Sequence, residues 1–333
     1  MSAKKNFGVG LDVGTMNIVS ARRGEKGVET KRMRDAFISL PPTQMKMLKL
    51  AKASFVERDD EVLILGDAAM EMANVFGMEP RRPLAGGLVS ASEMDALDVL
   101  KLLVQSVLGE PQIENEVCYF SVPAAPVDQP ERDVIYHRGV FERIVEECGF
   151  DPFPANEAMA IIFSECAAEG FTGVSFSFGS GMTNVALAIN TVEALSFSVA
   201  RGGDWIDKHA AQAVGATQAR MCAMKEAGID LMAPKTREEE ALVLYYKALI
   251  EHALDQVAAR FEAIKSQFAL QKAIPMVVSG GTSRAGNFLE FFNKVWAKKK
   301  RRFPIEVSEI RQAKEPLNAV ALGLLIQAMQ EYE

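Results

Sequence analysis

Two segments about half the chain apart repeat one pattern of strand, glycine turn and strand. The first, GVGLDVGTMNIVSA, surrounds Gly14; the second, VSFSFGSGMTNVALAI, begins at Val174 and surrounds Gly179 and Gly181. The stretches GTMNIVSA and GMTNVALA share a Gly, a Thr, an Asn, a β-branched residue and an Ala in similar order. A pattern that returns at this distance indicates a duplicated domain, each half contributing one glycine hairpin. Chance similarity between two glycine hairpins is the alternative.

The chain has an ordinary globular composition, with 333 residues, 49% of them hydrophobic and 24% charged. Its net charge of −7 argues against nucleic acid as a partner, because a phosphate backbone needs a basic surface. No stretch reaches the roughly 18 apolar residues of a membrane span. The N-terminus, Met1 to Asn6, is short and polar, so we expect neither a signal peptide nor membrane contact there.

The cysteines indicate a reducing compartment. Cys118, Cys148, Cys166 and Cys222 are scattered and form no Cys-x-x-Cys pair, and the chain has only three histidines. A zinc site is therefore not expected, and we interpret the thiols as reduced, buried and structural. The predicted location is the cytoplasm.

Hydrophobic spacing predicts alternating strands and helices with no long linker. We expect strands at Glu61–Gly66, Val117–Pro123, Pro275–Ser279 and near Pro304–Val307, besides the two hairpins. Asp67 is expected to cap a helix that begins at Ala68. The other expected helices are Ser92–Leu108, Asp128–Cys148, Ala158–Glu169, a long amphipathic helix within Thr236–Ser266, one from about Ala285 and one from Pro316.

The first hairpin carries the residues of a phosphate and metal site. A glycine turn such as that at Gly14 lets backbone N–H groups approach a phosphate closely. Asp12, just before the turn, suits a hydrated Mg²⁺, which prefers carboxylates and keeps most of its waters. A plain β-hairpin with an acidic shoulder is the alternative interpretation.

A second carboxylate stands at the start of a helix. Asn156-Glu157-Ala158-Met159-Ala160 enters that helix from a Pro-containing loop. A carboxylate at this place can orient a water for attack on a terminal phosphate. Glu157 could instead only compensate the helix dipole.

Three further glycine motifs follow in order. Gly179-Ser180-Gly181-Met182-Thr183-Asn184 forms the second hairpin turn, and Gly202-Gly203-Asp204 leads into a helix in which Asp207 is interpreted as an N-cap. Gly280 and Gly281, within Ser279–Ser283, let the backbone lie flat against a planar ring such as adenine. An ordinary tight turn before a helix is the alternative at each place.

The complete set resembles the superfamily of actin, sugar kinases and the seventy-kilodalton heat-shock chaperones, and most closely the bacterial actins of the MreB and MamK type. The matching segments run through nearly the whole chain: Asp12–Asn17, Leu65–Ala69, Arg82–Leu84, Gly87–Val89, Ser121–Pro123, Asn156–Ala160, Gly179–Asn184, Gly202–Asp204, Ser279–Ser283 and Pro316–Ala321. The resemblance implies an α/β, bilobal actin-like fold made of two duplicated RNase H-like domains with small inserted subdomains.

The resemblance also implies the domain bounds and the partners. The first lobe would comprise residues 1–158, with a small insert at about 33–86, plus a C-terminal helix in 310–333. The second would comprise 159–309, with a helical insert at about 202–266. ATP with Mg²⁺ would bind between the lobes, and the protein would polymerise with itself into cytoskeletal filaments.

The resemblance assigns roles to particular residues. Asp12 would hold the water shell of Mg²⁺, and Glu157 would position the attacking water. Lys225 and Glu226 would lie near the ribose, although a solvated charge pair is an equal alternative. The remaining nucleotide-binding residues would be Gly14, Thr15, Met16, Asn17, Gly179, Ser180, Gly181, Met182, Thr183, Gly202, Gly203, Asp204, Gly280, Gly281 and Thr282.

One position departs from the bacterial actin pattern. Two residues before the first glycine of the second phosphate motif, bacterial actins usually carry Asp, and this chain has Ser177. A neutral hydroxyl brings no charge to a metal shell, so we expect ATP to bind and its hydrolysis to be slow. Asp204 is the carboxylate best placed in the sequence to supply the missing charge.

Other functions remain open. A non-polymerising scaffold or regulator, of the pilus-assembly or chaperone type, is compatible with Ser177. A small-molecule kinase of the same superfamily would need a base for its substrate hydroxyl, and the sequence suggests no separate candidate. The basic run Lys298–Arg302 could meet an anionic lipid or partner, or could be a solvated helix end. Leu48, Leu50 and Phe55 could form a contact surface or pack internally.

Overall fold

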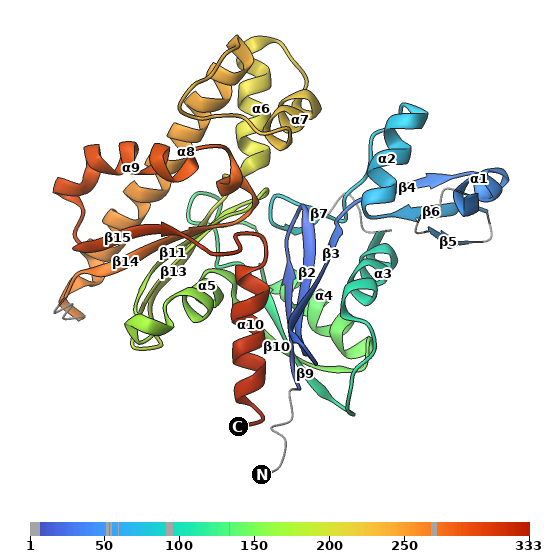
Figure 1. Ribbon diagram of the computed structural model, residues 1–333, viewed down its shortest axis with the longest axis horizontal. Helices are drawn as coiled ribbons and strands as arrows, with labels where there is room; N and C mark the ends of the chain where they lie inside the picture. Colours follow the sequence, from blue (N-terminus) through green and yellow to red (C-terminus); the bar gives the residue numbers. More distant parts are fainter. Residues whose placement is uncertain are drawn as a thin grey trace.

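The computed structural model describes residues 7–50, 53, 55–58, 60–90, 96–132, 134–267 and 272–333, apart from the side chains at positions 74 and 302. Within these residues, two five-stranded sheets form the centres of two lobes (Figure 1). The first sheet has the order β10-β9-β1-β2-β3. Its strands are β1 (Val9–Val13), β2 (Asn17–Gly24), β3 (Gly27–Arg34), β9 (Glu116–Val122) and β10 (Phe150–Asn156).

The second sheet repeats the topology of the first. Its order is β15-β14-β11-β12-β13, read from the strand that corresponds to β10. In both sheets the first strand pairs antiparallel with the next strand of a meander and parallel with a strand that returns much later in the chain. The predicted duplication is confirmed by this match. The strands are β11 (Gly173–Phe178), β12 (Thr183–Ile189), β13 (Val192–Val199), β14 (Ile274–Ser279) and β15 (Val307–Gln312).

Two helices lie between the sheets, α5 (Glu157–Glu165) and α10 (Ala319–Gln330) (Figure 1). They can approach each other closely because Gly323 has no side chain, and a Cβ there would lie 1.7 Å from the carbonyl oxygen of Ala160. Small residues of the second sheet, Ala186 and Ala188, face this layer. The central layer therefore joins the two lobes through close backbone packing.

The outer faces of the sheets are covered by other helices. On the first sheet, α3 (Leu97–Leu108) and α4 (Val134–Glu147) bury Leu11, Val13 and Phe120. On the second, α8 (Arg237–Ile264) and α9 (Phe288–Lys299) bury the alternate residues Phe176 and Phe178 of β11. Because side chains alternate along a strand, Ser175 and Ser177 then face the central helices. This alternation decides which side chains of β11 reach the site.

Each lobe carries a smaller subdomain. In the first lobe this subdomain is a three-stranded sheet of order β4-β6-β5 with short helices and a two-stranded hairpin (Figure 1). Its elements are β4 (Phe37–Leu40), η1 (Pro42–Gln44), α1 (Met45–Leu50), β5 (Phe55–Glu57), β6 (Val62–Leu65), α2 (Asp67–Phe76), β7 (Leu84–Ala85) and β8 (Leu88–Val89). In the second lobe it contains α6 (Gly203–Val214), α7 (Gln218–Glu226) and the start of α8.

The structure corrects several predicted boundaries. Residues 150–156, expected to be a loop because of Pro152 and Pro154, form β10. This strand lies at the edge of its sheet, where a missing N–H is tolerated. Helix α4 begins at Val134 rather than at Asp128, whose carboxylate instead accepts a hydrogen bond from the N–H of Ala200. Asp67 is the first residue of α2 rather than its cap, because the N-cap is Gly66.

Other expectations differ by a few residues or lie partly outside the described residues. Positions 92–95 of the helix expected before Leu108 lie outside them. The last strand is β15 rather than Pro304–Val307. The helix expected at Ala158–Glu169 is α5 followed by the 3-10 helix η3 (Ala167–Glu169). The helix expected from Ala285 is α9, preceded by the 3-10 helix η5 (Gly281–Arg284), and the one expected from Pro316 is α10. The remaining elements are the 3-10 helices η4 (Lys265–Gln267) and η6 (Lys300–Arg302).

Two surface expectations can be compared with the fold. Leu48 is fully buried and Phe55 packs beside it, whereas Leu50 is 86% exposed. The basic run Lys298–Arg302 closes α9 and continues as η6, and Lys299 pairs with Asp255. In the described part of the chain, no helix has the length and apolar character needed to cross a membrane. The exact lobe boundaries stay a prediction.

Candidate functional site

The two glycine turns have the same geometry. The N–H of Gly14 donates to the carbonyl of Asn17 over 3.1 Å, and the N–H of Gly179 donates to the carbonyl of Met182 over 3.0 Å. A Cβ at either glycine would lie within 3 Å of the accepting oxygen, at 2.8 Å for Gly14 and 2.9 Å for Gly179. Glycine is required at both positions so that each turn can close tightly.

The two turns meet at a third turn from the first lobe. A Cβ on Gly181 would lie 2.0 Å from the backbone nitrogen of Gly87 and 2.6 Å from the hydroxyl of Thr15. The side chain of Met182 packs over Gly87 on the same side. The first phosphate turn, the second phosphate turn and the β7–β8 turn therefore touch where the lobes come together.

Asp12 lies on β1, two residues before Gly14, and lines the same space as the turns. Its Oδ1 accepts a hydrogen bond from the hydroxyl of Ser121 over 3.0 Å. The same hydroxyl oxygen accepts from the N–H of Val13 over 2.8 Å, so Ser121 fixes the end of β1. Burial raises the pKa of Asp12 well above its usual value, the charge of Glu157 raises it further, and Ser121 lowers it.

Glu157 is held by two side chains of the second lobe. Asn156 caps α5 by accepting from the N–H groups of Ala158 and Met159, which places Glu157 as the first helical residue. Its Oε1 accepts from the hydroxyl of Ser177 over 2.6 Å, and its Oε2 accepts from the amide of Asn184 over 2.8 Å. Burial raises the pKa of Glu157, and these two donors lower it.

The orientation of the Asn184 amide is itself determined. The hydroxyl of Ser198 donates to Oδ1 of Asn184, so the NH₂ group must point toward Glu157. Ser177, Asn184 and Ser198 are each almost completely buried. The carboxylate of Glu157 is thereby fixed in one direction relative to Asp12.

The pair of acids has the chemistry of a cation site. The charged group with the largest effect on Asp12 is another carboxylate, Glu157. The charge of one carboxylate raises the pKa of a second carboxylate nearby, and a divalent cation would relieve their repulsion. Carboxylate oxygens are the ligands that Mg²⁺ prefers. The residues present therefore fit a magnesium ion held through water.

Helix α6 begins against the second phosphate turn. The N–H groups of Gly203 and Asp204 donate to the carbonyls of Gly179 and Ser180, each over 2.9 Å. The first donors of this helix are thus used inside the protein. Asp204 accepts from the hydroxyl of Ser180 over 2.7 Å and pairs with Arg82 over 3.1 Å. These contacts leave no support for Asp204 as the carboxylate that replaces the missing aspartate at Ser177.

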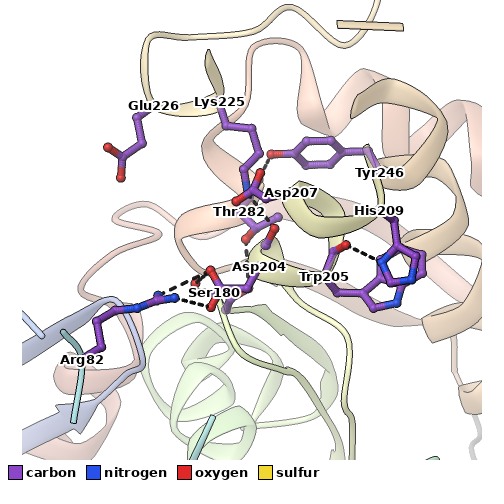
Figure 2. A network of polar contacts seen from close by, with 12 residues as sticks. Arg82, Ser180, Asp204, Trp205, Asp207, His209, Lys225, Glu226, Tyr246 and Thr282 are labelled. Atoms are coloured by element: carbon purple, nitrogen blue, oxygen red, sulfur yellow. Dashed lines mark hydrogen bonds and ion pairs between the residues drawn. The ribbon is translucent and has the colours of Figure 1, made fainter. Parts of the chain in front are cut away.

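Lys225 and Asp207 form a buried pair. Nζ of Lys225 lies 2.9 Å from Oδ2 of Asp207 and donates to the carbonyl of Gly203 over 2.9 Å (Figure 2). Asp207 is only 1% exposed, and its burial raises its pKa to about 6 despite the opposing effect of Lys225. It is not the helix cap that the sequence suggested, because the N-cap is Gly202. The interpretation of Lys225 and Glu226 as a solvated pair is wrong for Lys225, which is 12% exposed and pairs with Asp207. Glu226 is 45% exposed and pairs with Arg34.

The last glycine motif closes the other side of the site. Gly280 has φ of 91°, and a Cβ there would lie 2.4 Å from the carbonyl oxygen of Phe178. The hydroxyl of Thr282 donates to the carbonyl of Gly179 over 2.9 Å, and the hydroxyl of Tyr246 donates to the carbonyl of Thr282 over 3.3 Å. This turn is thus attached directly to the second phosphate turn.

Together these elements line one interlobe cleft of about 450 Å³, a volume in the range of ligand-binding pockets. Thr183, Gly202 and Asp204, expected at the site, do not line it. Thr183 is fully buried and bonds to Arg201, and Gly202 lies against the backbone of Ser180. The expected residues that line it are Asp12, Gly14, Thr15, Met16, Asn17, Glu157, Gly179, Ser180, Gly181, Met182, Gly203, Lys225, Glu226, Gly280, Gly281 and Thr282.

Several lining residues were not expected from the sequence. Arg32 and Arg34 reach the cleft from β3, and Arg284 and Tyr246 from the second lobe. Arg34 pairs with Asn17 in the β2–β3 register, so its strand lies directly beside the first phosphate turn. The signal for the two arginines is their spacing of two residues, which puts both on one face of a strand.

Comparisons with solved structures identify the fold. A MamK double helical filament matches with a TM-score of 0.71 at 17% identity, over 97% of this chain and 99% of that one. MreB5 of Spiroplasma citri bound to ADP matches with a TM-score of 0.66 at 15% identity, over 99% and 98%. The ethanolamine utilization protein EutJ from Carboxydothermus hydrogenoformans matches with a TM-score of 0.56 at 17% identity, over 98% and 91%.

These matches confirm the predicted actin-like, bilobal fold along nearly the full chain. The comparison with curated proteins found no match. The family model for volactin matches residues 7–328, a span that contains both sheets, both phosphate turns and the cleft between the lobes. The chain therefore belongs to the volactin family.

Proposed function

We propose that this chain binds ATP with Mg²⁺ in the interlobe cleft, hydrolyses it slowly and assembles into filaments. The observation that carries the proposal is the pair of matching glycine turns, one from each lobe, with Asp12 and Glu157 between them in one cleft. Such turns suit a polyphosphate because unhindered backbone N–H groups can approach its oxygens. The adenosine would lie toward Gly280, Gly281 and Thr282, with Lys225 and Glu226 beside the ribose.

The roles of the two acids follow from their surroundings. Glu157 is held by Ser177 and Asn184, and each carboxylate oxygen keeps a further lone pair with which to accept a proton from a water. A group fixed in this way orients a water for attack on the terminal phosphate without having to reorganise. Asp12 would hold Mg²⁺ through water, and the ion would supply positive charge where the phosphate oxygens gather negative charge.

The filament proposal is supported by a similar structure. One of the solved structures that share this fold is a MamK double helical filament. Head-to-tail contacts between identical subunits produce an open filament when the rotation from one subunit to the next does not close into a ring. We propose a cytoplasmic, cytoskeletal polymer in which every cleft has the same orientation, with the lobe boundaries given by the sequence.

A non-polymerising scaffold is the second candidate, and one observation favours it. Ser177 replaces a carboxylate with a neutral hydroxyl at the site where the bacterial actins it resembles carry Asp, so the chain could bind nucleotide without efficient turnover. The same fold also occurs in EutJ, whose name refers to ethanolamine utilization rather than to a filament. Fold alone does not decide between these tasks.

Sedimentation and light scattering with and without ATP and Mg²⁺ test the proposal. We expect protein at many micromolar to pellet and scatter light only with nucleotide, together with slow phosphate release. Nucleotide binding with flat light scattering would overturn the filament and favour the scaffold. Transfer of phosphate to an added metabolite would instead indicate a kinase. The same assay with GTP determines which base the cleft prefers.

A further inference from the structure

Arg34 and Arg82 each reach from the first lobe to a carboxylate of the second. Nη1 of Arg34 lies 2.7 Å from Oε1 of Glu226, and Nη2 of Arg82 lies 3.1 Å from Oδ2 of Asp204. Figure 2 shows Arg82 reaching the network of Asp204 and Ser180, whereas the side chain of Glu226 points away from that of Lys225. Both Arg34 and Glu226 line the cleft, but neither Arg82 nor Asp204 does. Only the first pair therefore spans the cleft itself.

The Arg34 end of this pair is attached to the first phosphate turn. Arg34 lies opposite Asn17 in the β2–β3 ladder, and the N–H of the next residue, Asp35, donates to the carbonyl of Met16 over 3.1 Å. Nε of Arg34 also lies 3.5 Å from Oδ1 of Asp67, the first residue of α2. The guanidinium is thus held at the junction of the first sheet and its small subdomain.

The Glu226 end is attached equally firmly to the second lobe. Glu226 is the last residue of α7, next to Lys225. Lys225 anchors this end of α7 to α6 through Asp207 and the carbonyl of Gly203. Because both ends are fixed to the cleft walls, the pair can separate only if a side chain swings away or the lobes move apart.

We propose that the ion pair between Arg34 and Glu226 is a clasp across the nucleotide cleft, and that Arg34 thereby sets how fast bound nucleotide is released. This inference rests on the proposed nucleotide binding. A nucleotide that extends from the phosphate turns to the sugar end of the cleft lies behind the clasp, which must open for release. The Arg82 pair, which lies outside the cleft, holds the lobes together without closing the exit.

The test measures the release of tritiated ATP after excess unlabelled ATP is added. Protein that still holds tritiated ATP is collected on filters. The protein concentration is kept below that at which light scattering rises. We compare the wild type with Arg34→Met, Glu226→Gln and the double variant. A partly exposed ion pair makes a modest contribution, so we expect release about threefold to tenfold faster in Arg34→Met. In a Glu226→Gln background the same change should add little, because the partner is already lost.

Arg32→Met is the matched control. Arg32 lies two residues away on the same strand face and lines the same cleft, and the described residues give it no ion pair to the second lobe. If the clasp operates, this change accelerates release less than Arg34→Met does, because it removes the same charge from the cleft but breaks no ion pair across it. Raising the salt concentration should speed release more from the wild type than from Arg34→Met, because salt screens the ion pair in addition to the general attraction between the cleft and the phosphates.

The outcomes separate the clasp from the proposed function. If the wild type binds no ATP, nucleotide binding itself is refuted. If ATP binds but dissociates from the wild type and all variants at the same rate, the clasp is refuted and nucleotide binding stands. The same holds if Arg32→Met and Arg34→Met accelerate release equally. Additive effects of Arg34→Met and Glu226→Gln would likewise show that the two residues act separately.

Discussion

The hydroxyl of Ser177 donates a hydrogen bond to Oε1 of Glu157 over 2.6 Å, so the residue that replaces the usual aspartate of bacterial actins holds the carboxylate that would orient water. The replacement has two effects. It removes a negative charge from the proposed metal shell, and it adds a donor that stabilises the ionised form of Glu157. In the proposed Mg²⁺ site, Ser177 would thus favour a fixed carboxylate and a weakly held cation.

We first predict the effect of Ser177→Asp. With Mg²⁺, the second carboxylate should strengthen the hold on the metal shell and accelerate phosphate release by up to about 10²-fold at matched polymer mass. Without Mg²⁺, two carboxylates would face each other and the variant should lose roughly 2 kcal/mol of stability. An unchanged or lower rate of phosphate release with Mg²⁺ would mean that Ser177 does not limit hydrolysis.

The two acids are predicted to have separable roles. Asp12→Ala should weaken Mg²⁺-nucleotide binding, because it removes the carboxylate nearest the first phosphate turn. Glu157→Gln should leave binding within about twofold and slow phosphate release by on the order of 10²-fold, because an orienting group acts mainly in the transition state. Calorimetric titration and single-turnover phosphate release measure the two effects. Equal loss of affinity in both variants would contradict this assignment.

The hairpins, the buried strands and the long helix α8 were predictable because each depends on residues that are close in sequence. Gly14 and Gly179 sit between β-branched or apolar runs, and Thr236 caps a continuous amphipathic pattern. Strand β10 was missed because Pro152 and Pro154 argue against a central strand, and the sequence does not reveal that this strand lies at an edge.

The predictions for the site failed where a side chain is used inside the protein. Thr183 and Gly202 belong to motifs that do line the cleft. The side chain of Thr183 points away from the cleft because side chains alternate along a strand, and Gly202 is covered by close backbone packing. The contacts of Arg34 with Glu226 and of Ser177 with Glu157 depend on how the lobes and the central helices come together. Pairings between such distant positions cannot be read from local spacing.

Asp35 is predicted to make stability depend on pH. It is fully buried, accepts a hydrogen bond from the N–H of Leu84, and has a pKa raised by burial from 3.8 to about 8, against the lowering effect of Arg82. The native state therefore binds this proton more tightly than the unfolded state. Stability from this group is present at low pH and is lost as pH rises from about 4 to about 8.

Asp35→Asn removes this titration and keeps an oxygen that can accept from Leu84. Between about pH 6 and pH 8 the wild type should lose roughly 2 kcal/mol more of unfolding free energy than the variant, measured by urea unfolding. All other groups titrate in both proteins, so the difference reports Asp35. Parallel pH profiles would show that Asp35 is ionised in the folded protein.

The last prediction concerns the contact between the phosphate turns. Three glycines form a graded series in the space available for a Cβ. A Cβ at Gly139 would meet nothing, and one at Gly203 would meet the side-chain ends of Thr282 and Lys225, which can move. A Cβ at Gly181 would meet the fixed backbone of Gly86 and Gly87. Backbone cannot yield as a side chain does, so Gly181→Ala must push the turns of the two lobes apart. It should cost about 3 kcal/mol of stability or more and abolish nucleotide binding.

The other two variants make this prediction testable even if Gly181→Ala does not fold. Gly139→Ala lies within helix α4 on an exposed face and should stabilise the protein by up to about 1 kcal/mol, because alanine is the better helix former. Gly203→Ala should remain folded and bind ATP more weakly, because the hydroxyl of Thr282 and the ammonium of Lys225 must shift. Thermal unfolding and ATP titration of all three variants should give this order. A Gly181→Ala protein that unfolds at the wild-type temperature and binds ATP would show that the phosphate turns do not touch. Contact between these turns would then not be what closes the cleft.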